Sequence, residues 1–368
     1  MKHIITALGA LAMTTTLAQA GGIDRSGQDV GILFEKGRIV ELSFGNVTPN
    51  VKGTDVLGNK IGNVADSFIQ GSIGFKADIN DKLSYAVILD APFAADIEYG
   101  GSPAATMLGG TTATANSTAL TGLLRYKFDD RTSVYGGLRL QQASAHIDLR
   151  GLAYGGLNGY SVDLGTDNKV GYVVGAAYEI PDIALRVALT YNSEIEHNFD
   201  TVETVGPFPF GVGKTKVKTP QSVNLDFQSG IAKDTLVFGS VRWADWSSFT
   251  LNPASFTAVS PGGLIDLEDT VTYTLGIGRK FNETWSGAFS LTYEDKANPL
   301  VSPLAPTNGF FGATIAGVYT KDNMKITAGI NYTHLGDAKP ETGTPDVARA
   351  DFTGNDAVGV GVKVAFTF

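Results

Sequence analysis

The last fourteen residues, Asn355 to Phe368, read NDAVGVGVKVAFTF. From Val358 onward every second residue is large and apolar, and the residues between are small or polar. Because side chains alternate between the two faces of a strand, this pattern predicts a β-strand with one apolar and one polar or crowded face. A terminal aromatic residue is typical of the closing strand of an outer-membrane β-barrel. The alternative is the edge strand of a soluble β-sandwich.

Composition narrows the class of protein. The chain has 368 residues, of which 18% are charged, and it contains 45 glycines, 20 phenylalanines and 13 tyrosines. Low charge and many glycines suit closely spaced strands around a lumen. The net charge of −9 gives no basic surface for nucleic acid. With no cysteine, disulfides, thiolate metal sites and cysteine nucleophiles are excluded.

The beginning of the chain predicts export. Lys2 precedes an apolar run from Ile4 to Met13, and small residues follow up to Ala18-Gln19-Ala20. This arrangement predicts a signal peptide over residues 1–20, cleaved before Gly21. After Ala20 no apolar stretch approaches the roughly 18 residues that indicate a membrane helix. Export without such a helix points to the bacterial outer membrane.

Residues 21–37 lack the alternating pattern but contain one apolar cluster, Val30, Ile32, Leu33 and Phe34. They form either a disordered leader or a short plug, or hatch, inside the barrel. The cluster favours the hatch, because a free leader has no use for buried apolar residues.

Residues 38–368 are predicted to form the barrel itself. Its strands alternate apolar and polar residues, and the connections between strands are alternately short turns and long loops. We predict an all-β, 14-stranded antiparallel transmembrane barrel with strands at 38–48, 68–78, 83–91, 117–128, 132–149, 168–180, 183–194, 219–232, 235–247, 268–281, 284–295, 309–320, 324–335 and 358–368. Short turns on the side of both termini and long loops on the other side are typical of outer-membrane barrels.

Charged residues on the strands indicate which face is lumenal. A charge that faces lipid at mid-bilayer costs about 2–4 kcal/mol, so the polar face should point inward. The cations predicted to face the lumen are Arg125, Arg139, Arg186, Arg242 and Lys363. They either brace the lumen by pairing with residues such as Asp226 and Glu294, or form a path that attracts anions.

The chain resembles the FadL/TodX family of outer-membrane transporters for long-chain fatty acids and other hydrophobic compounds. The block from Thr219 to Phe249 resembles a family strand, short turn and strand ending W-x-x-W-S-x-F, which Trp243, Trp246, Ser247 and Phe249 match. The following block, LEDTVTYTLGIGRKFNETWSGAFSLTYEDKANP, also resembles the family. The resemblance covers Arg38 to Phe368 and is most specific after Asn168.

The resemblance implies a barrel plugged by an N-terminal hatch, through which ligand passes without an energy source in the barrel. It implies an apolar outer groove, an inner pocket beside the hatch and a sideways exit at a kinked third strand. The family's Asn-Pro-Ala motif is missing from the short hatch; the one in the chain, Asn252 to Ala254, lies in a predicted outer loop.

Two predicted outer loops carry apolar residues that could form the groove. These residues are Leu149, Leu152, Tyr154, Leu157, Val205, Phe208, Phe210 and Val212. The alternative is that the loops pack on each other as a lid. The predicted wall kink is Asp90-Ala91-Pro92, since proline has no N–H for the ladder; alternatively, the strand simply ends there.

Nothing in the sequence predicts an enzyme, a cofactor or a metal site. The four histidines are His3, His146, His197 and His334, and none has the spacing of a catalytic triad or a metal motif. We therefore expect a monomeric channel in the outer membrane for passive uptake of hydrophobic compounds, with long-chain fatty acids as the expected ligands. The alternative is a general porin or a structural barrel without specific lipid binding.

Overall fold

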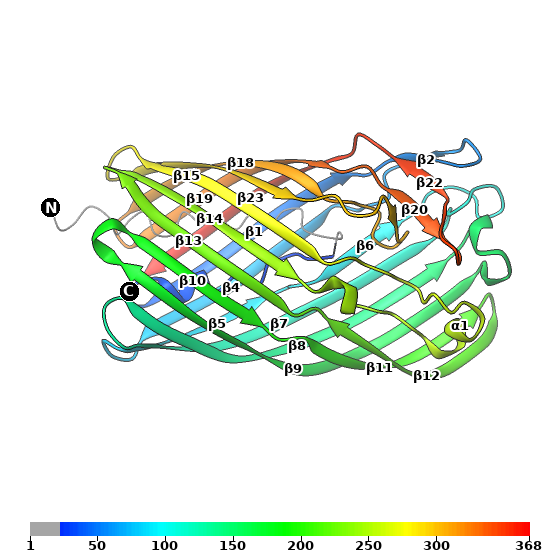
Figure 1. The fold of residues 1–368 in the computed structure, drawn as a ribbon, viewed down its shortest axis with the longest axis horizontal. Coiled ribbons are helices and arrows are strands. Elements are labelled where there is room, and N and C mark those ends of the chain that lie inside the picture. Colours follow the sequence, from blue (N-terminus) through cyan, green and yellow to red (C-terminus); the bar gives the residue numbers. More distant parts are fainter. Residues whose placement is uncertain (1–22) are drawn as a thin grey trace.

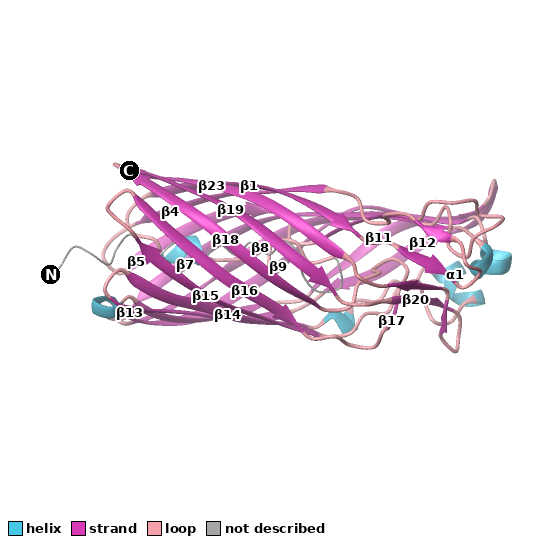
Figure 2. Ribbon diagram, turned by 90° about the horizontal axis from the view of Figure 1, so that it is seen from above, coloured by secondary structure: helices cyan, strands magenta, loops and turns pink. Residues whose placement is uncertain are grey.

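The computed structural model describes residues 23–368, so the predicted signal peptide, Gly21 and Gly22 lie outside the described part. The chain forms one closed antiparallel β-barrel (Figures 1 and 2). Its sheet contains seventeen segments, because three of the fourteen strands are each divided in two. The predicted fold is confirmed. Within residues 23–368, no helix is long and apolar enough to cross a membrane.

The strands of the barrel follow one another in chain order. They are β1 (Ile39–Asn50), β4 (Phe68–Asp78), β5 (Leu83–Asp90) with β6 (Ala94–Glu98), β7 (Thr112–Lys127), β8 (Thr132–Leu149), β9 (Tyr160–Ile180), β10 (Leu185–Asn192) with β11 (Ile195–Val205), β12 (Phe208–Thr219) with β13 (Ser222–Ala232), β14 (Thr235–Ala244), β15 (Thr270–Lys280), β16 (Trp285–Glu294), β18 (Phe310–Lys321), β19 (Met324–Leu335) and β23 (Asp356–Thr367).

Short elements complete the fold. They are the 3₁₀ helices η2 (Gly31–Phe34), η3 (Leu152–Leu157), η4 (Pro181–Ile183) and η5 (Trp246–Ser248), the helix α1 (Ala254–Val259), and the strands β2 (Gly53–Asp55), β3 (Lys60–Ile61), β17 (Leu300–Val301), β20 (Lys339–Thr342), β21 (Val347–Ala348) and β22 (Ala350–Phe352).

The first and last strands close the barrel. β1 pairs with β23 over its full length, from Ile39 opposite Thr367 to Asn50 opposite Asp356. On its other edge β23 pairs with β19. Every backbone group that crosses a membrane must be satisfied within the protein, and this closure leaves the sheet no free edge there.

The two ends of the barrel differ in the length of their connections. The C-terminus lies at the end with short turns, and the longer connections with β2, β20, β22 and α1 lie at the other end (Figure 1). In the short turns, side chains cap the backbone: Asp129 Oδ1 accepts the N–H groups of Arg131 and Thr132 at 2.8 and 2.7 Å. Asn282 does the same for Thr284 and Trp285. Such capping explains why Asp and Asn recur in the short turns.

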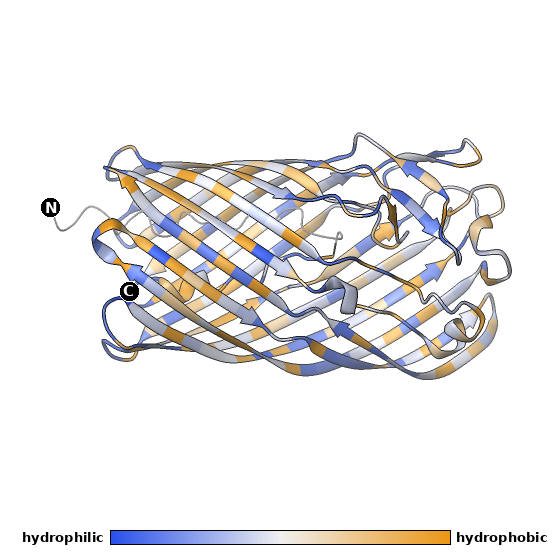
Figure 3. Ribbon diagram, viewed as in Figure 1, coloured by the Kyte–Doolittle hydropathy of each residue, from blue (hydrophilic) through white to orange (hydrophobic). Residues whose placement is uncertain are grey.

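Hydrophobic and hydrophilic residues alternate along the strands of the barrel (Figure 3). Examples of exposed apolar residues are Leu124, Leu189, Leu275, Ile315 and Ile330. Polar residues that alternate with them, such as Thr121, Thr190, Thr314 and Asn331, are buried. This division is that of a barrel with lipid outside and a polar interior.

Several predicted boundaries are wrong at the end with the long loops. The predicted loop after Glu194 is instead the hairpin β11–β12, and the predicted loop before Ser117 contains β6 and the start of β7. The β11–β12 hairpin carries exposed ion pairs between Asp200 and Lys214 and between Glu196 and Lys216. Because its exposed side carries these charges beside Val202 and Val212, it does not show the alternation expected of a strand that faces lipid.

The N-terminal segment, residues 23–37, lies against inward-facing residues of the barrel. Arg242 Nη2 lies 2.7 Å from Asp24 Oδ2, and both side chains are buried. Asn224 Nδ2 donates to the carbonyl of Gly27, and Ser222 Oγ donates to Gln28 Oε1. The segment is therefore tied to β13 and β14 by polar contacts.

Asp24→Asn should loosen the N-terminal segment, because it leaves the buried Arg242 guanidinium without its carboxylate. Breaking one partner of a buried ion pair costs about 3–5 kcal/mol. We expect larger and more frequent ion-conducting openings in planar bilayers, together with a lower midpoint of thermal unfolding.

Asp200→Asn is the matched control. It breaks a pair with Lys214 in which the two side chains are 86% and 59% exposed. Exposed pairs contribute about 0–1 kcal/mol, so conductance and unfolding should stay as in the wild type. Wild-type conductance in Asp24→Asn would contradict a restraining role for the buried pair.

Candidate functional site

An apolar cavity of about 90 Å³ lies inside the barrel, toward the end with the long connections, which we call the top. Its wall comes from consecutive strands and contains many alanines, and its lining residues include Ala95, Ala113, Ala115, Ala143, Ala145, Ile147, Leu164, His197, Phe199 and Val217. We call this cavity the chamber. Small side chains at alternating inward positions leave the space that larger residues would fill.

The floor of the chamber joins the N-terminal segment to the barrel wall. Ile23 and Phe93 both line the chamber. Asp24 and Phe93 form an isolated antiparallel bridge, and the N–H of Ala94 donates to the carbonyl of Ile23 at 2.9 Å. The N–H of Arg25 donates to the carbonyl of Pro92 at 2.8 Å. The segment thus acts locally as a partner strand for residues 92–94.

The top of the chamber is closed by residues from the long connections. Phe249, Leu251, Ile265 and Leu304 line it from this side. Trp246 is fully buried, and its ring lies 5.5 Å from Phe93 and 5.8 Å from Phe249. We call Trp246, Phe249, Leu251, Ile265 and Leu304, together with α1, the cap. An extensive apolar cluster thus separates the chamber from the outside.

The wall is interrupted at the predicted kink. β5 ends at Asp90 and β6 begins at Ala94, so Ala91 and Pro92 lie between them. β4 pairs with β5 only from Ile73 to Asp78, which leaves Phe68 to Ser72 without a partner in β5. Ser117 Oγ takes over part of the ladder, because it accepts the N–H of Phe93 and donates to the Phe93 carbonyl.

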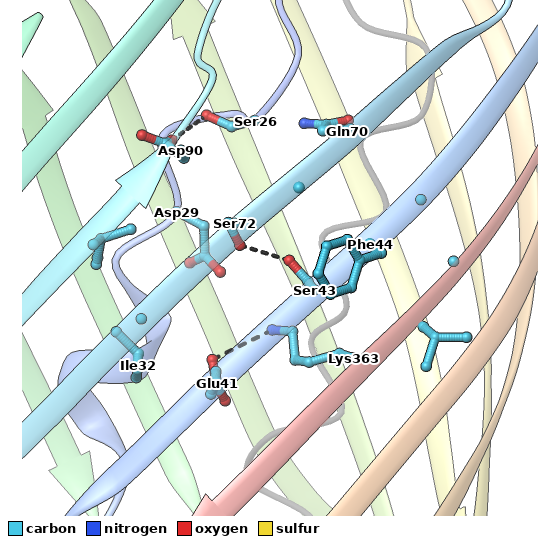
Figure 4. A pocket seen from close by; sticks show the side chains of 16 residues that line it. Ser26, Asp29, Ile32, Glu41, Ser43, Phe44, Gln70, Ser72, Asp90 and Lys363 are labelled. Carbon is cyan, nitrogen blue, oxygen red and sulfur yellow. Dashed lines mark hydrogen bonds and ion pairs between the residues drawn. The ribbon is translucent and has the colours of Figure 1, made fainter.

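A polar cavity of about 130 Å³ lies next to this interruption (Figure 4). Ser26 Oγ donates to Asp90 Oδ2 at 2.5 Å, and Lys363 Nζ lies 3.7 Å from Glu41 Oε2. The cavity also touches Phe44 and Val362, whose side chains are exposed on the outer wall. It therefore borders both the segment and the lipid-facing side.

The predicted hatch residues lie away from the chamber. Val30, Ile32 and Leu33 are buried around η2, and Phe34 lies 5.5 Å from Tyr135 in an edge-on contact. None of the four lines the chamber; Ile32 lines the polar cavity instead. Ile23 is the residue of the segment that the sequence analysis missed.

The predicted groove residues do not form one surface. Leu149 is buried, and Tyr154, Leu157, Val205 and Phe210 pack against the same apolar cluster as the chamber residues. Leu152 is 46% exposed, Phe208 72% and Val212 82%. Val205, Phe208, Phe210 and Val212 belong to the β11–β12 hairpin rather than to a loop, and a register shift leaves Phe210 unpaired between Pro209 and Gly211, so the regular alternation of β12 is broken there.

The five predicted lumenal cations have partners inside the barrel. Arg125 pairs with Glu179, Arg242 with Asp24 and Lys363 with Glu41. Arg139 Nη1 donates to Asn192, and the Arg186 guanidinium lies 4.6 Å from the centre of the Phe34 ring. Asp226 and Glu294, the partners expected from the sequence, do not form these ion pairs.

Two of the described histidines have carboxylate partners. His146 bonds Asp163 at the outer part of β8 and β9, and His197 bonds Asp167. Across residues 23–368, no group of three or more histidine, aspartate or glutamate side chains could hold a metal ion.

One acidic group in the outer connections has a shifted pKa. Glu341 lies in β20, which pairs with β17 and β21 outside the barrel. Burial, and then the nearby Asp346 and Asp266, raise the pKa of Glu341 to about 7. Since the folded pKa is raised, Glu341 supports the local fold fully below its ordinary pKa, and this support is lost as the pH rises through 7.

Glu341→Gln should remove this pH dependence, because an amide stays neutral. In the wild type, hydrogen exchange around residues 339–348, corrected for intrinsic rates, should be several-fold faster at pH 8 than at pH 5. In the variant the two corrected rates should agree. A wild-type β20–β21 hairpin equally protected at both pH values would contradict the role assigned to Glu341.

A family described as "Outer membrane protein transport protein (OMPP1/FadL/TodX)" matches residues 32–368. No curated protein matches the chain. Among solved structures, a FadL homologue of Pseudomonas aeruginosa is 15% identical, with a TM-score of 0.73 and 92% of each chain covered. The Pseudomonas putida toluene transporter TodX is 13% identical, with a TM-score of 0.64 and coverage of 97% of this chain and 94% of that one.

The Ralstonia pickettii toluene transporter TbuX is 13% identical, with a TM-score of 0.63 and coverage of 91% and 90%. At these identities the structural likeness shows the fold, whereas the family match extends over nearly the whole described chain. The barrel resides in the bacterial outer membrane, and the chain belongs to the OMPP1/FadL/TodX family of outer membrane transport proteins.

Proposed function

We propose that this protein is a passive outer-membrane channel for small hydrophobic compounds, which it holds in the chamber. The observation that carries the proposal is the apolar chamber itself, which lies between the cap and the N-terminal segment. Binding sites for small molecules are concave, largely apolar and few in each protein, and the chamber has these properties.

The size of the chamber favours a compact ligand. An apolar cavity of roughly 150 Å³ in another protein binds benzene, and the chamber has about 90 Å³. A single aromatic ring therefore needs only a modest widening, whereas a long-chain fatty acid would also have to displace the cap. The toluene transporters among the structural relatives support the same class of ligand. Long-chain fatty acids, the ligands expected from the sequence, are the alternative that the experiment below separates.

Release is proposed to occur where β5 and β6 are interrupted. The interruption directly adjoins Ile23 and Phe93 at the chamber floor. A movement of the N-terminal segment, here the proposed hatch, would open the chamber toward the polar cavity and the unpaired part of β4. From there a compound could pass sideways into the membrane or past the segment. A general porin, the alternative, would instead show a large and steady ionic current.

Ala115→Phe should block the chamber. Ala115 lines it, and a phenyl group there would occupy the ligand's space. We expect the affinity of the purified barrel for radiolabelled toluene to fall by about tenfold or more, equivalent to at least about 1.4 kcal/mol. Equilibrium dialysis in detergent, with protein-free micelles as the blank, measures this affinity; radiolabelled oleate is measured in parallel.

Thr118→Phe is the matched control on the same strand. Its side chain is exposed on the outer wall, where an aromatic residue near the membrane interface is tolerated. It should bind toluene as the wild type does. Equal toluene binding by Ala115→Phe and Thr118→Phe would rule out the chamber as the site. Tighter binding of oleate than of toluene by the wild type would favour the fatty-acid alternative.

A further inference from the structure

A second irregular region of the barrel wall, here called the seam, lies between β9 and β11, beyond β7 and β8 from the β5–β6 interruption. β9 pairs with β10 from Ile180 to Val173, and with β11 only from Leu164 to Tyr160. Between these stretches, residues 165–171 of β9 and 194–200 of the neighbouring strand face each other without a backbone ladder. The register is the same on both sides, so the strands have parted locally rather than slipped.

Three adjacent strands are irregular at this level. β9 has a bulge where its pairing with β8 shifts between Ala143 and Ala145. β10 and β11 are separated by Ser193 and Glu194, and β12 and β13 by Pro220 and Gln221. Bulges and breaks in neighbouring strands re-aim a wall and often lie next to functional sites. The seam is therefore a built feature of three strands, not a defect of one.

Side chains close the seam in place of the ladder. Asp167 Oδ2 accepts the N–H of Asn198 at 3.1 Å and bonds Nδ1 of His197 at 3.1 Å. His197 is fully buried, and its ring stacks on Phe199 at 5.4 Å. Ser193 Oγ accepts the N–H of Tyr172 at the lower end. A small number of hydrogen bonds thus holds these two strands together.

The seam borders the chamber on one side and faces the outside of the barrel on the other. Leu164, His197 and Phe199 line the chamber. At the lower end, the Tyr172 and Tyr191 rings lie 5.9 Å apart, and aromatic residues of this kind mark the membrane interface. Above them, exposed Glu196 and Asp200 pair with lysines. The seam therefore lies at headgroup level, where water can satisfy unpaired backbone groups.

We propose that this seam is a lateral entrance, through which hydrophobic compounds dissolved in the outer leaflet reach the chamber. Opening the cap would separate an extensive cluster of buried apolar residues, including Trp246, Leu251 and Leu304. Opening the seam breaks the Asp167 bonds, the bonds between Ser193 and Tyr172 and the five residue pairs between β9 and β11. It also parts four members of the same cluster, Tyr160, Val162 and Leu164 on β9 from Phe199 on β11. The seam is the smaller disruption, and a compound reaches it by diffusion in the plane of the membrane.

A disulfide across the upper end of the seam tests this inference, which rests on the proposed function. A Cβ placed on Gly165 lies 3.9 Å from Asp200 Cβ, within the roughly 3.5–4.5 Å range of disulfides. The chain has no other cysteine. In cells of a host without its own family members, oxidised Gly165→Cys/Asp200→Cys should take up radiolabelled toluene about tenfold more slowly. A reductant should restore the rate.

Gly211→Cys/Ser255→Cys is the matched lock on the cap. A Cβ on Gly211 lies 3.0 Å from Ser255 Cβ, closer than the disulfide range, so a disulfide there requires α1 to move outward slightly and then ties β12 to α1. Its oxidised form should take up toluene at the wild-type rate. Asp167→Ala is an independent test. If the seam is the entrance, loss of the hydrogen bonds that join Asp167 to His197 and Asn198 should speed toluene uptake severalfold.

The outcomes separate the two proposals. Normal uptake with the seam disulfide shown to be formed overturns the lateral entrance, and slow uptake only with the cap lock assigns access to the top. Toluene binding by the detergent-solubilised seam-locked barrel should remain as in the wild type. If the unlocked wild type neither binds nor takes up toluene, the proposed function itself fails.

Discussion

The structure depends on the rule that no backbone N–H or C=O group may face lipid without a partner. A closed barrel meets this rule because its first and last strands pair over their whole length, from Ile39 with Thr367 to Asn50 with Asp356. Closure fixes the register, and the register decides which side chains face lipid. It also confines irregular backbone to places where the N-terminal segment, a side chain or water can act as the partner.

The interruption between β5 and β6 shows how such a partner is supplied. Ser117 Oγ bonds both backbone groups of Phe93, and the N-terminal segment exchanges backbone bonds with Pro92 and Ala94. A displaced segment would leave those backbone groups unsatisfied until water or another group reached them, at a cost of about 1–3 kcal/mol each. Movement of the N-terminal segment and opening of the wall between β5 and β6 are therefore energetically coupled through these shared backbone hydrogen bonds.

Alternation in the sequence predicts the barrel well, since the membrane enforces it wherever a strand faces lipid. The number of strands, the closing pair and the short turns follow from it. The rule weakens above the membrane, where the exposed side of β11 and β12 carries Glu196, Asp200 and Lys214 beside Val202 and Val212. The hairpin was therefore predicted as a loop, and Phe208 and Phe210 were assigned to one groove although Phe208 is exposed and Phe210 packs against the buried apolar cluster.

The chamber could not be predicted for a different reason. Its wall depends on alanines at 113, 115, 143 and 145, and alanine at an inward position looks the same whether it borders a cavity or a neighbouring side chain. Ile23 stands apart from the apolar cluster at residues 30–34 on which the hatch was predicted, so its place in the chamber floor was missed. Only the packing of distant strands tells which small residues leave space.

The partners of the lumenal cations bear on the two roles considered for them, bracing the lumen and forming an anion path. An anion path needs cations that can exchange partners with the passing ion, yet Arg242 is buried against Asp24 and Arg125 against Glu179. Separating Asp24 from Arg242 would leave two buried charges uncompensated, which costs several kcal/mol. These protein partners favour a bracing role for the cations over an anion path, and the apolar chamber is the part of the lumen proposed to hold a hydrophobic compound. This arrangement favours selective passage of apolar molecules over general conduction of ions.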